Sequence, residues 1–496
     1  MRRDRPDVLF IVMDCARQAE FGTTGDAAPR IPSFRSLESE ALVFDRAISP
    51  ASWTLPAHAS LFTGLYPWQH GVSSIGRAVL SPSLTTLPET LREAGYRTAS
   101  FSANPHISPI TGMTRGFETA FWGGFDDCSL RPVTGARSIL CSFGSGGTTS
   151  TSLERADPRG VLKAKLRSIA LRAPWAYDAG IRAYSYLNPT SRAGDSRVAP
   201  WIEPKLREWL SRTPRDVPAF AFVNLLDAHE PYYGLPREFP GFGEWIRLFW
   251  SSQRETALLD AQFRRTARTL HTLYTHAIEV MDKRIAQITD LFRELHRWED
   301  CLVVVTSDHG QAFGEEGSVY HRWGYADTLY QVPLLVRYPE GEGAPGRWPL
   351  PFSTRQIPSL IARACGIGNS RADEQAPGRG VPNGPAEGTI LSLADHQGFS
   401  APTEDRAVPP LSLPGIGIVA YARGKKFVVP VPTGPLSDRS GASIGSENHR
   451  TISSEGSRED RAGRTLALEA ATSMQSLREE FFDGTTDRRL RGWGYT

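Results

Sequence analysis

Three short segments, far apart in the chain, carry residue types that could together hold a metal ion against an oxyanion. Asp14 closes one apolar run of the sequence, and Asp308 and His309 follow a second. Thr54 opens a segment with a Thr-x-Pro start. Carboxylates, one imidazole and a hydroxyl suit Mn²⁺, Mg²⁺, Ca²⁺ or Zn²⁺. This combination predicts hydrolysis or transfer of a phosphate or sulfate ester.

Thr54 is open to two compatible interpretations. Thr-x-Pro is a common helix opening, with Thr as the N-cap and Pro in the first turn. A helix N-terminus also favours an alkoxide and an incoming oxyanion, so the same hydroxyl could act as a metal-activated nucleophile. Ser52 and Ser60 are the competing hydroxyls. For Asp14, the structural alternative to a metal ligand is an N-cap of the segment that follows.

Three histidines are candidates for contacts with a substrate. His58 lies one helical turn after Thr54, so both can face one site, and we predict that it binds substrate. His229 and His321 are candidates for protonating the leaving oxygen. The alternatives are a partly buried helix histidine for His58 and a loop histidine packed on Tyr232 for His229.

Further residues near these segments have weaker claims. Arg17 could neutralise the charge of a substrate, although a surface arginine is the alternative. Cys15 adjoins Asp14 and would favour zinc as a soft ligand, or it is a buried inert thiol. His70, which precedes a glycine, is predicted to be structural.

Composition bounds the class of protein. The chain has 496 residues, 40% hydrophobic and 22% charged, an ordinary globular balance. The net charge of +2 offers no strong field for nucleic acid, so no nucleic-acid partner is expected. The five cysteines are scattered and lack metal-type spacing, which indicates reduced thiols and a cytoplasmic location. We expect neither a signal peptide nor a run of the roughly 20 apolar residues that a membrane span needs.

Apolar strands alternate with helical segments along the chain. The predicted strands cover residues 8–13, 96–101, 219–226, 302–306 and 332–338, and the predicted helices cover 32–42, 86–95 and 258–296. This order predicts an α/β fold with a mainly parallel sheet and helices on both faces. Sites in such sheets form at the carboxyl ends of strands. The residues Asp14, Asp227, His229, Asp308 and His309 all occupy such ends.

Composition changes suggest how the chain is divided. Residues 1–385 are predicted to form the main α/β domain, and residues 386–496 a small C-terminal α+β subdomain. Runs 415–420 and 426–431 predict a hairpin in the second part. Gly-, Pro- and Ser-rich composition predicts a flexible insertion at 126–160, a link at 366–410 and a disordered loop at 433–465.

Together these residues resemble the sulfatase family of the alkaline phosphatase superfamily over roughly residues 6–340. The matching stretches are Pro6–Asp14, Ser60–Pro67, Leu91–Ala99, Val303–Gly310, Val332–Val336 and Glu479–Asp483. The resemblance implies a large α/β domain, which would be the catalytic one, followed by a small C-terminal sheet domain with a helix. It also implies an ester hydrolase with one divalent cation held by Asp14, Asp308, His309 and the Thr54 oxygen.

The departures from the family narrow the chemistry. Sulfatases proper carry a cysteine or serine that becomes formylglycine, with Pro-Ser-Arg after one further residue. The aligned residues here are Thr54, Pro56, Ala57 and His58, so formylglycine is not expected. The usual second acid is Cys15, and no lysine lies between Lys283 and Lys425 to grip a sulfate. The pattern is more similar to members that handle phosphodiesters, phosphonates or phosphoglycerol head groups through an unmodified threonine.

Three functions remain open at this point. The leading one is a metal-dependent esterase in which Thr54 attacks phosphorus or sulfur, His229 or His321 protonates the leaving alcohol, and water releases the anion. The second is a transferase in which a glycan or lipid alcohol replaces water. The third is a non-catalytic protein that binds an oxyanion. The expected partner is a small-molecule or glycan- or lipid-derived ester, and the sequence leaves the oligomeric state open.

Overall fold

The computed structural model describes most of the first three quarters of the chain and three strands beyond it. The described residues are 5–22, 28–73, 79–122, 199–230, 232, 261–315, 319–321, 325–367, 390–394, 417–422 and 425–430. The predicted insertion at 126–160, the boundary between residues 385 and 386 and the predicted loop at 433–465 lie outside these residues.

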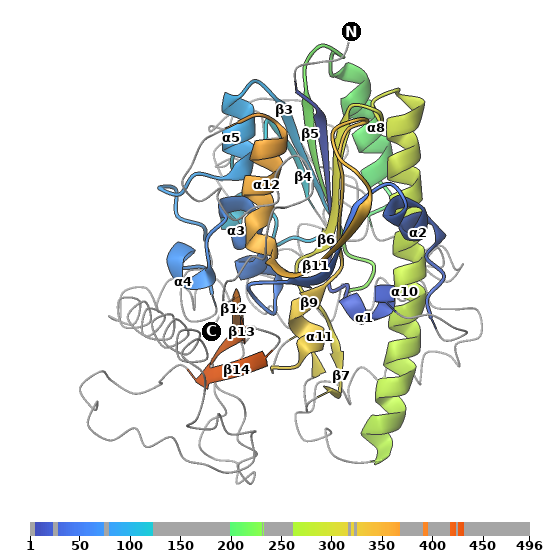
Figure 1. Cartoon of the computed structure of the whole chain (residues 1–496), viewed down its shortest axis with the longest axis vertical. Coiled ribbons are helices and arrows are strands. Elements are labelled where there is room, and N and C mark those ends of the chain that lie inside the picture. The colour runs from blue at the N-terminus through green and yellow to red at the C-terminus, as the bar shows by residue number, and fades with distance from the viewer. Residues whose placement is uncertain are drawn as a thin grey trace, which may run out of the picture.

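One sheet of nine strands runs through the described part of the chain (Figure 1). Its strands are β1 (Asp7–Met13), β2 (Leu42–Ile48), β3 (Arg97–Ser102), β4 (Thr119–Trp122), β5 (Ala219–Leu225), β6 (Cys301–Ser307), β9 (Gln331–Val332), β10 (Leu334–Arg337) and β11 (Gly346–Ser353). The order is β11-β2-β10-β6-β1-β5-β3-β4, with β9 paired to β2. The strands from β6 to β4 are parallel, and β10 is antiparallel to both neighbours. The predicted α/β fold with a mainly parallel sheet is confirmed.

Helices cover both faces of this sheet. They are α1 (Gln18–Gly22), α2 (Pro32–Glu38), α3 (Thr54–Thr63), α4 (Pro67–His70), α5 (Leu87–Glu93), α8 (Ile202–Arg212), α10 (Ala261–Glu294), α11 (Asp327–Tyr330) and α12 (Ile357–Ala364), with 3₁₀ turns at Pro109–Thr111 and Thr354–Gln356. In Figure 1, α2, α8 and α10 lie on one side of the sheet and α3, α5 and α12 on the other. A short two-stranded ladder, β7 (Ala312–Phe313) with β8 (Val319–Tyr320), lies between β6 and β9 along the chain.

Alternation along β1 explains the two hydrophobic cores. Leu9, Ile11 and Met13 belong to the cluster that contains side chains of α2, α8 and α10. The intervening residues of the strand belong to the cluster that contains side chains of α3, α5 and α12. Successive residues of a strand point to opposite faces, so a continuously apolar strand is the signature of a sheet buried on both sides.

Three predicted elements differ from the structure. The predicted helix 32–42 ends at Glu38, and the chain then enters β2, a strand that the sequence interpretation missed. The predicted strand 332–338 is divided at Pro333 into β9 and β10, because proline has no N–H for a ladder hydrogen bond. The long helix is described from Ala261 and runs without a break to Glu294, two residues short of the predicted end, whereas the predicted start at 258 lies outside the described residues.

A second sheet follows the first along the chain. The strands β12 (Ile390–Ala394), β13 (Gly417–Ala422) and β14 (Lys425–Pro430) pair antiparallel in that order. The predicted hairpin is β13–β14, shifted by one or two residues at its bounds. Val419 of β13 is buried in a cluster with Ile48 and Tyr330, so this sheet packs on the end of β2. Among the described helices, none combines the length and the apolar character needed to cross a membrane.

Candidate metal and nucleophile site

The predicted metal ligands meet at the carboxyl edge of the sheet. The parallel neighbours β1 and β6 end level with each other, with Met13 opposite Ser307, so Asp14 and Asp308 follow at adjacent positions. Both carboxylates are fully buried. The Cys15 backbone N–H donates to Asp308 Oδ1 at 3.3 Å, and the His309 N–H donates to the same oxygen at 2.8 Å. These bonds orient one oxygen of Asp308.

The ring of His309 is oriented so that one nitrogen faces the site. Its Nδ1 lies 3.0 Å from Gly310 O, which assigns the proton to Nδ1. Its Nε2 therefore carries a lone pair, and it lies 3.4 Å from Thr54 Oγ1 and 3.4 Å from Asp308 Oδ2. A backbone acceptor on one nitrogen that leaves the other free is the usual arrangement of a metal-binding histidine.

Thr54 is the first residue of α3, and its hydroxyl is not used as a cap. The N-cap position is Trp53, and it makes no side-chain cap hydrogen bond. The Oγ1 of Thr54 instead faces His309 Nε2 and accepts a hydrogen bond from Asn104 Nδ2 at 3.4 Å. The hydroxyl is thus placed at a helix N-terminus, where backbone N–H groups favour negative charge.

Asn104 is a residue of this site that the sequence interpretation missed. Its Nδ2 donates to Asp14 Oδ2 at 2.7 Å as well as to the Thr54 hydroxyl. Ser102 holds the turn after β3, since its Oγ donates to Asn104 O and accepts from the Asn104 N–H, both at 3.1 Å. A signal was available, because Asn104 follows the predicted strand 96–101, and carboxyl ends of strands were the expected location of the site.

The negative charges of the two buried carboxylates repel each other, and a bound cation would offset this repulsion. Burial and the neighbouring Asp14 raise the pKa of Asp308 well above its usual range. Burial also acts to raise the pKa of Asp14, but His229, His309 and the hydrogen bond from Asn104 outweigh it and lower that pKa. Among the described residues, Asp308 Oδ2 is buried and makes no hydrogen bond. Two carboxylates, His309 Nε2 and a hydroxyl therefore fit a divalent cation.

His58 lies beside this group and is entirely buried. Its Nδ1 donates to Thr54 O at 3.0 Å and lies 3.4 Å from Asp308 Oδ2. Its Nε2 accepts from Asn224 Nδ2 at 3.5 Å, so both ring nitrogens have partners. Burial lowers the pKa of His58 to about 4, so the ring is neutral at pH 7. This geometry holds Asp308 and the start of α3 together, and substrate binding by His58 stays a prediction.

The two histidines predicted to protonate a leaving group lie side by side. The ring centroids of His229 and His321 are 4.8 Å apart, and those of His321 and His309 are 4.7 Å apart. Glu230 lies between the first two, with Oε2 3.7 Å from His229 Nδ1 and 3.5 Å from His321 Nδ1. His321 is 1% exposed, and its Nε2 makes no hydrogen bond within the described part of the chain.

The positive charge of Arg17, a predicted substrate-binding residue, is already paired with two carboxylates. Its guanidinium pairs with Glu20 at 2.8 Å and with Glu315 at 2.6 Å. These two carboxylates neutralise the guanidinium, and substrate binding by Arg17 stays a prediction. Asp227, which was noted at the end of β5, pairs with Arg284 at 3.0 Å.

Comparison with known proteins was consistent across sequence and fold. Residues 6–364 match the Sulfatase family. Mouse steryl-sulfatase is 26% identical over 403 residues, which cover 73% of this chain and 62% of that protein. An uncharacterized sulfatase of Escherichia coli K12 is 22% identical over 68% of this chain and 64% of its own length. The matches to these curated relatives thus span less than two thirds of their length.

Solved structures share the fold at low sequence identity. The phosphonate monoester hydrolase of Agrobacterium radiobacter superposes with a TM-score of 0.55 at 17% identity, covering 97% of both chains. A protein solved with its substrate D-glucosamine-2-N,6-O-disulfate gives a TM-score of 0.60 at 12% identity, covering 95% of this chain and 98% of that one. The matched family residues contain the whole metal and nucleophile site, and the chain therefore belongs to the sulfatase family.

Proposed function

We propose that this chain is a metal-dependent ester hydrolase in which Thr54 is the nucleophile. The observation that carries the proposal is the position of the Thr54 hydroxyl. It lies at the start of α3, 3.4 Å from His309 Nε2, in a pocket of side chains that includes two buried carboxylates. The family usually has a cysteine or serine, the formylglycine precursor, at the position of Thr54. Threonine is not expected to be converted, so Thr54 would act unmodified.

Asp14, Asp308, His309 and the Thr54 oxygen would hold one divalent cation. When bound, such an ion supplies positive charge that activates a hydroxyl and offsets the charge of an oxyanion. The identity of the ion is left open among Mn²⁺, Ca²⁺, Mg²⁺ and Zn²⁺, because oxygen donors with one imidazole are compatible with each.

The reaction of the chain's own residues has two steps. Thr54 Oγ1 gives its proton to water and forms a bond to phosphorus or sulfur as the bond to the leaving alcohol breaks, which gives a covalent threonyl ester. His229 or His321 donates a proton to the leaving oxygen. Water then attacks the threonyl ester and releases the acid. The Asn104 amide, 3.4 Å from Thr54 Oγ1, is placed to donate to an oxygen of the transferred group.

A phosphorus ester fits these residues better than a sulfate ester. An unmodified threonine can take a phosphoryl group from a diester or a phosphonate monoester and release it to water. Within the described part of the chain, the positive charge of Arg17 is paired with Glu20 and Glu315 and is not free to bind a sulfate. A related fold belongs to a phosphonate monoester hydrolase. A small-molecule or glycan- or lipid-derived ester of this kind is the proposed substrate class, and a sulfate ester is the runner-up.

A cytoplasmic location is part of the same proposal. Among the described residues, Cys15, Cys301 and Cys365 are buried thiols that form no disulfide. Reduced thiols are typical of proteins that work in a reducing compartment.

The test uses metal-stripped protein and a panel of aryl esters. The panel contains a sulfate, a phosphate monoester, a phosphate diester and a phosphonate monoester, each assayed with one divalent ion at a time. Thr54→Ala removes the nucleophile, and Ser60→Ala is the matched control because Ser60 is on the same helix with its hydroxyl 3.0 Å from His70 Nε2.

Metal-dependent cleavage of the diester or phosphonate that is lost in Thr54→Ala and kept in Ser60→Ala would support the proposal. Turnover that survives Thr54→Ala would contradict the nucleophile. A preference for the sulfate would overturn the choice of phosphorus. Absence of turnover until a sugar or lipid alcohol is added would indicate a transferase, and absence with every acceptor would indicate an oxyanion-binding protein.

A further inference from the structure

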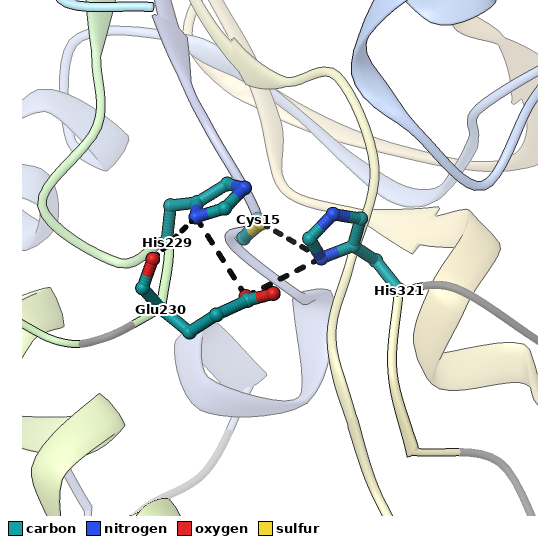
Figure 2. A group of neighbouring side chains, drawn as sticks. All are labelled: Cys15, His229, Glu230 and His321. Carbon is teal, nitrogen blue, oxygen red and sulfur yellow. Dashed lines mark hydrogen bonds and ion pairs between the residues drawn. The ribbon is translucent and has the colours of Figure 1, made fainter. Parts of the chain in front are cut away.

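Four side chains next to the proposed catalytic centre form a second group of metal-binding type. Cys15, His229, Glu230 and His321 each offer a ligand atom, and these atoms all lie within 4.8 Å of one another. Figure 2 shows Glu230 reaching between the two imidazoles, with the Cys15 sulfur facing His321. Cys15 also belongs to a buried group with Asp14 and His309, whereas His229, Glu230 and His321 are found only in the first of these two groups.

The spacing of these atoms matches a tetrahedral zinc site. Cys15 Sγ lies 3.6 Å from His321 Nδ1. Glu230 Oε2 lies 3.5 Å from His321 Nδ1 and 3.7 Å from His229 Nδ1. Tetrahedral zinc, with Zn–S of about 2.3 Å and Zn–N or Zn–O of about 2.0–2.1 Å, gives ligand-to-ligand edges of ~3.3–3.6 Å. The group therefore needs only small side-chain movements to receive an ion.

The backbone holds these side chains in place. Cys15 adopts a left-handed conformation with φ of 65°, which is rare for a residue other than glycine. Tyr320, the residue before His321, is left-handed as well, with φ of 56°. Gln311 connects two of the group, since its Nε2 donates to Glu230 Oε2 at 3.1 Å and its Oε1 lies 3.0 Å from His321 Nδ1. The site is built from two buried residues, Cys15 and His321, and two half-buried ones, His229 and Glu230.

We infer that Cys15, His229, Glu230 and His321 bind a second metal ion, and that this ion is Zn²⁺. One thiolate, two imidazoles and one carboxylate are the donors that zinc prefers, whereas Mg²⁺ and Ca²⁺ take oxygen ligands. Binding releases the proton of the Cys15 thiol. The two imidazoles change tautomer, so that their protons move from the Nδ1 atoms, which lie near Gln311 Oε1 and Glu230 O, to the Nε2 atoms.

The second site would adjoin the first. The Cys15 thiol donates to Asp14 Oδ1 at 3.3 Å, so the two ligand sets are in direct contact. With zinc bound, His229 and His321 hold the ion, so this inference replaces their role as proton donors in the proposed function, and the leaving alcohol takes its proton from water. The inference is independent of the Thr54 nucleophile, because the four ligands do not include it.

Cobalt substitution tests the site without an activity assay. The full-length chain is stripped of metal and titrated with Co²⁺, and the absorption of a cobalt–thiolate bond in the near ultraviolet is followed with the visible bands of tetrahedral cobalt. The expected result is a thiolate band that saturates and that Zn²⁺ bleaches by displacement. Cys15→Ser abolishes the band, and Cys301→Ser keeps it, because Cys301 is a buried thiol of β6 outside the group.

Variants of the other ligands assign the thiolate to one centre. Glu230→Gln and His321→Ala are expected to weaken cobalt binding at least tenfold, and they serve also if Cys15→Ser does not fold. Asp308→Asn is expected to leave the band in place. The inference is overturned if the wild type has no thiolate band, or if Cys15→Ser keeps it. It is overturned equally if the band depends on Asp308 rather than on Glu230 and His321.

Discussion

Replacing Asp308 by asparagine should keep or raise stability without metal, and should remove most of the stabilisation that metal gives. Burial and Asp14 raise the pKa of Asp308. The folded chain therefore keeps a proton that the unfolded chain loses above a pKa of about 3.9. Stability is then fully present below that pH and is lost as pH rises toward the folded-state pKa, by about 1.4 kcal/mol per pH unit. At pH 7 the loss of stability in the wild type amounts to at most about 4 kcal/mol. Asparagine does not ionise, so the variant does not suffer this loss.

Bound metal acts against this difference in stability, because it stabilises the wild type more than the variant. A cation at one hundred times its dissociation constant stabilises the wild type by about 2.7 kcal/mol. Asp308→Asn removes a ligand whose Oδ2 is free of hydrogen bonds to the described residues, so the variant should lose most of this gain. The assay is thermal unfolding at pH 7, first with a chelator and then with Mn²⁺. We expect the variant to melt at or above the wild type with the chelator, and to shift far less with metal.

A second buried carboxylate provides the control. Asp282 accepts the backbone N–H groups of Ser33 and Phe34 at 3.0 and 2.8 Å, away from the metal ligands, so Asp282→Asn should change stability by the same amount with and without metal. The reasoning is refuted if Asp308→Asn is less stable than the wild type in chelator. It is refuted as well if Mn²⁺ shifts the variant and the wild type by the same amount.

Three further predictions concern residues around the site. Asn104→Ala removes a hydrogen bond to the buried Asp14 carboxylate, worth about 1.5–3 kcal/mol, and should weaken metal binding about 10- to 100-fold by calorimetric titration. Burial lowers the pKa of His70 to about 3, so the wild type should lose stability as pH falls below about 6.5, by up to about 1.4 kcal/mol per pH unit. Other buried histidines such as His58 add to the same slope, so urea unfolding of His70→Gln should show a slope that is shallower by the share of one histidine, and an unchanged slope would contradict the assignment. Gly310→Ala would put a Cβ 1.8 Å from Thr328 O, so it should destabilise the chain by at least about 1–3 kcal/mol and abolish turnover, and a native melting temperature would contradict it.

The metal ligands could be predicted because their position depends on topology. Asp14 and Asp308 each follow a continuously apolar strand, and such strands are buried in a parallel sheet. Their ends then lie at one edge, and the register of β1 with β6 makes them neighbours. The sequence alone could not say that these strands are adjacent, since 293 residues separate Cys15 from Asp308, which its backbone contacts.

Asn104 and Glu230 show where the sequence interpretation stopped. Asn104 follows a strand that was predicted, yet asparagine after a strand is most often a turn residue, so its donation to Asp14 was not foreseen. Glu230 adjoins His229, but glutamate is common on surfaces, and only the folded chain places it between two histidines. Both roles depend on tertiary contacts that no local pattern encodes.

The bounds of β2 and of α3 illustrate a local limit. The strand from Leu42 to Ile48 has polar side chains in its middle. It therefore did not match the continuously apolar pattern of the other strands. Thr54 was interpreted as an N-cap, whereas the helix already includes it and Trp53 takes the cap position. A shift of one residue at a helix end is ordinary, but here it leaves the hydroxyl facing His309 and not the backbone.

The central claim is that Thr54 carries the transferred group during turnover. The most direct measurement is peptide mass spectrometry of protein quenched in acid while it turns over an aryl phosphodiester or phosphonate with its activating metal. The account predicts the mass of the phosphoryl or phosphonyl group on residue 54, in the wild type and in Thr54→Ser. A group found on Ser52, Ser60 or another side chain, with residue 54 unmodified, would contradict it.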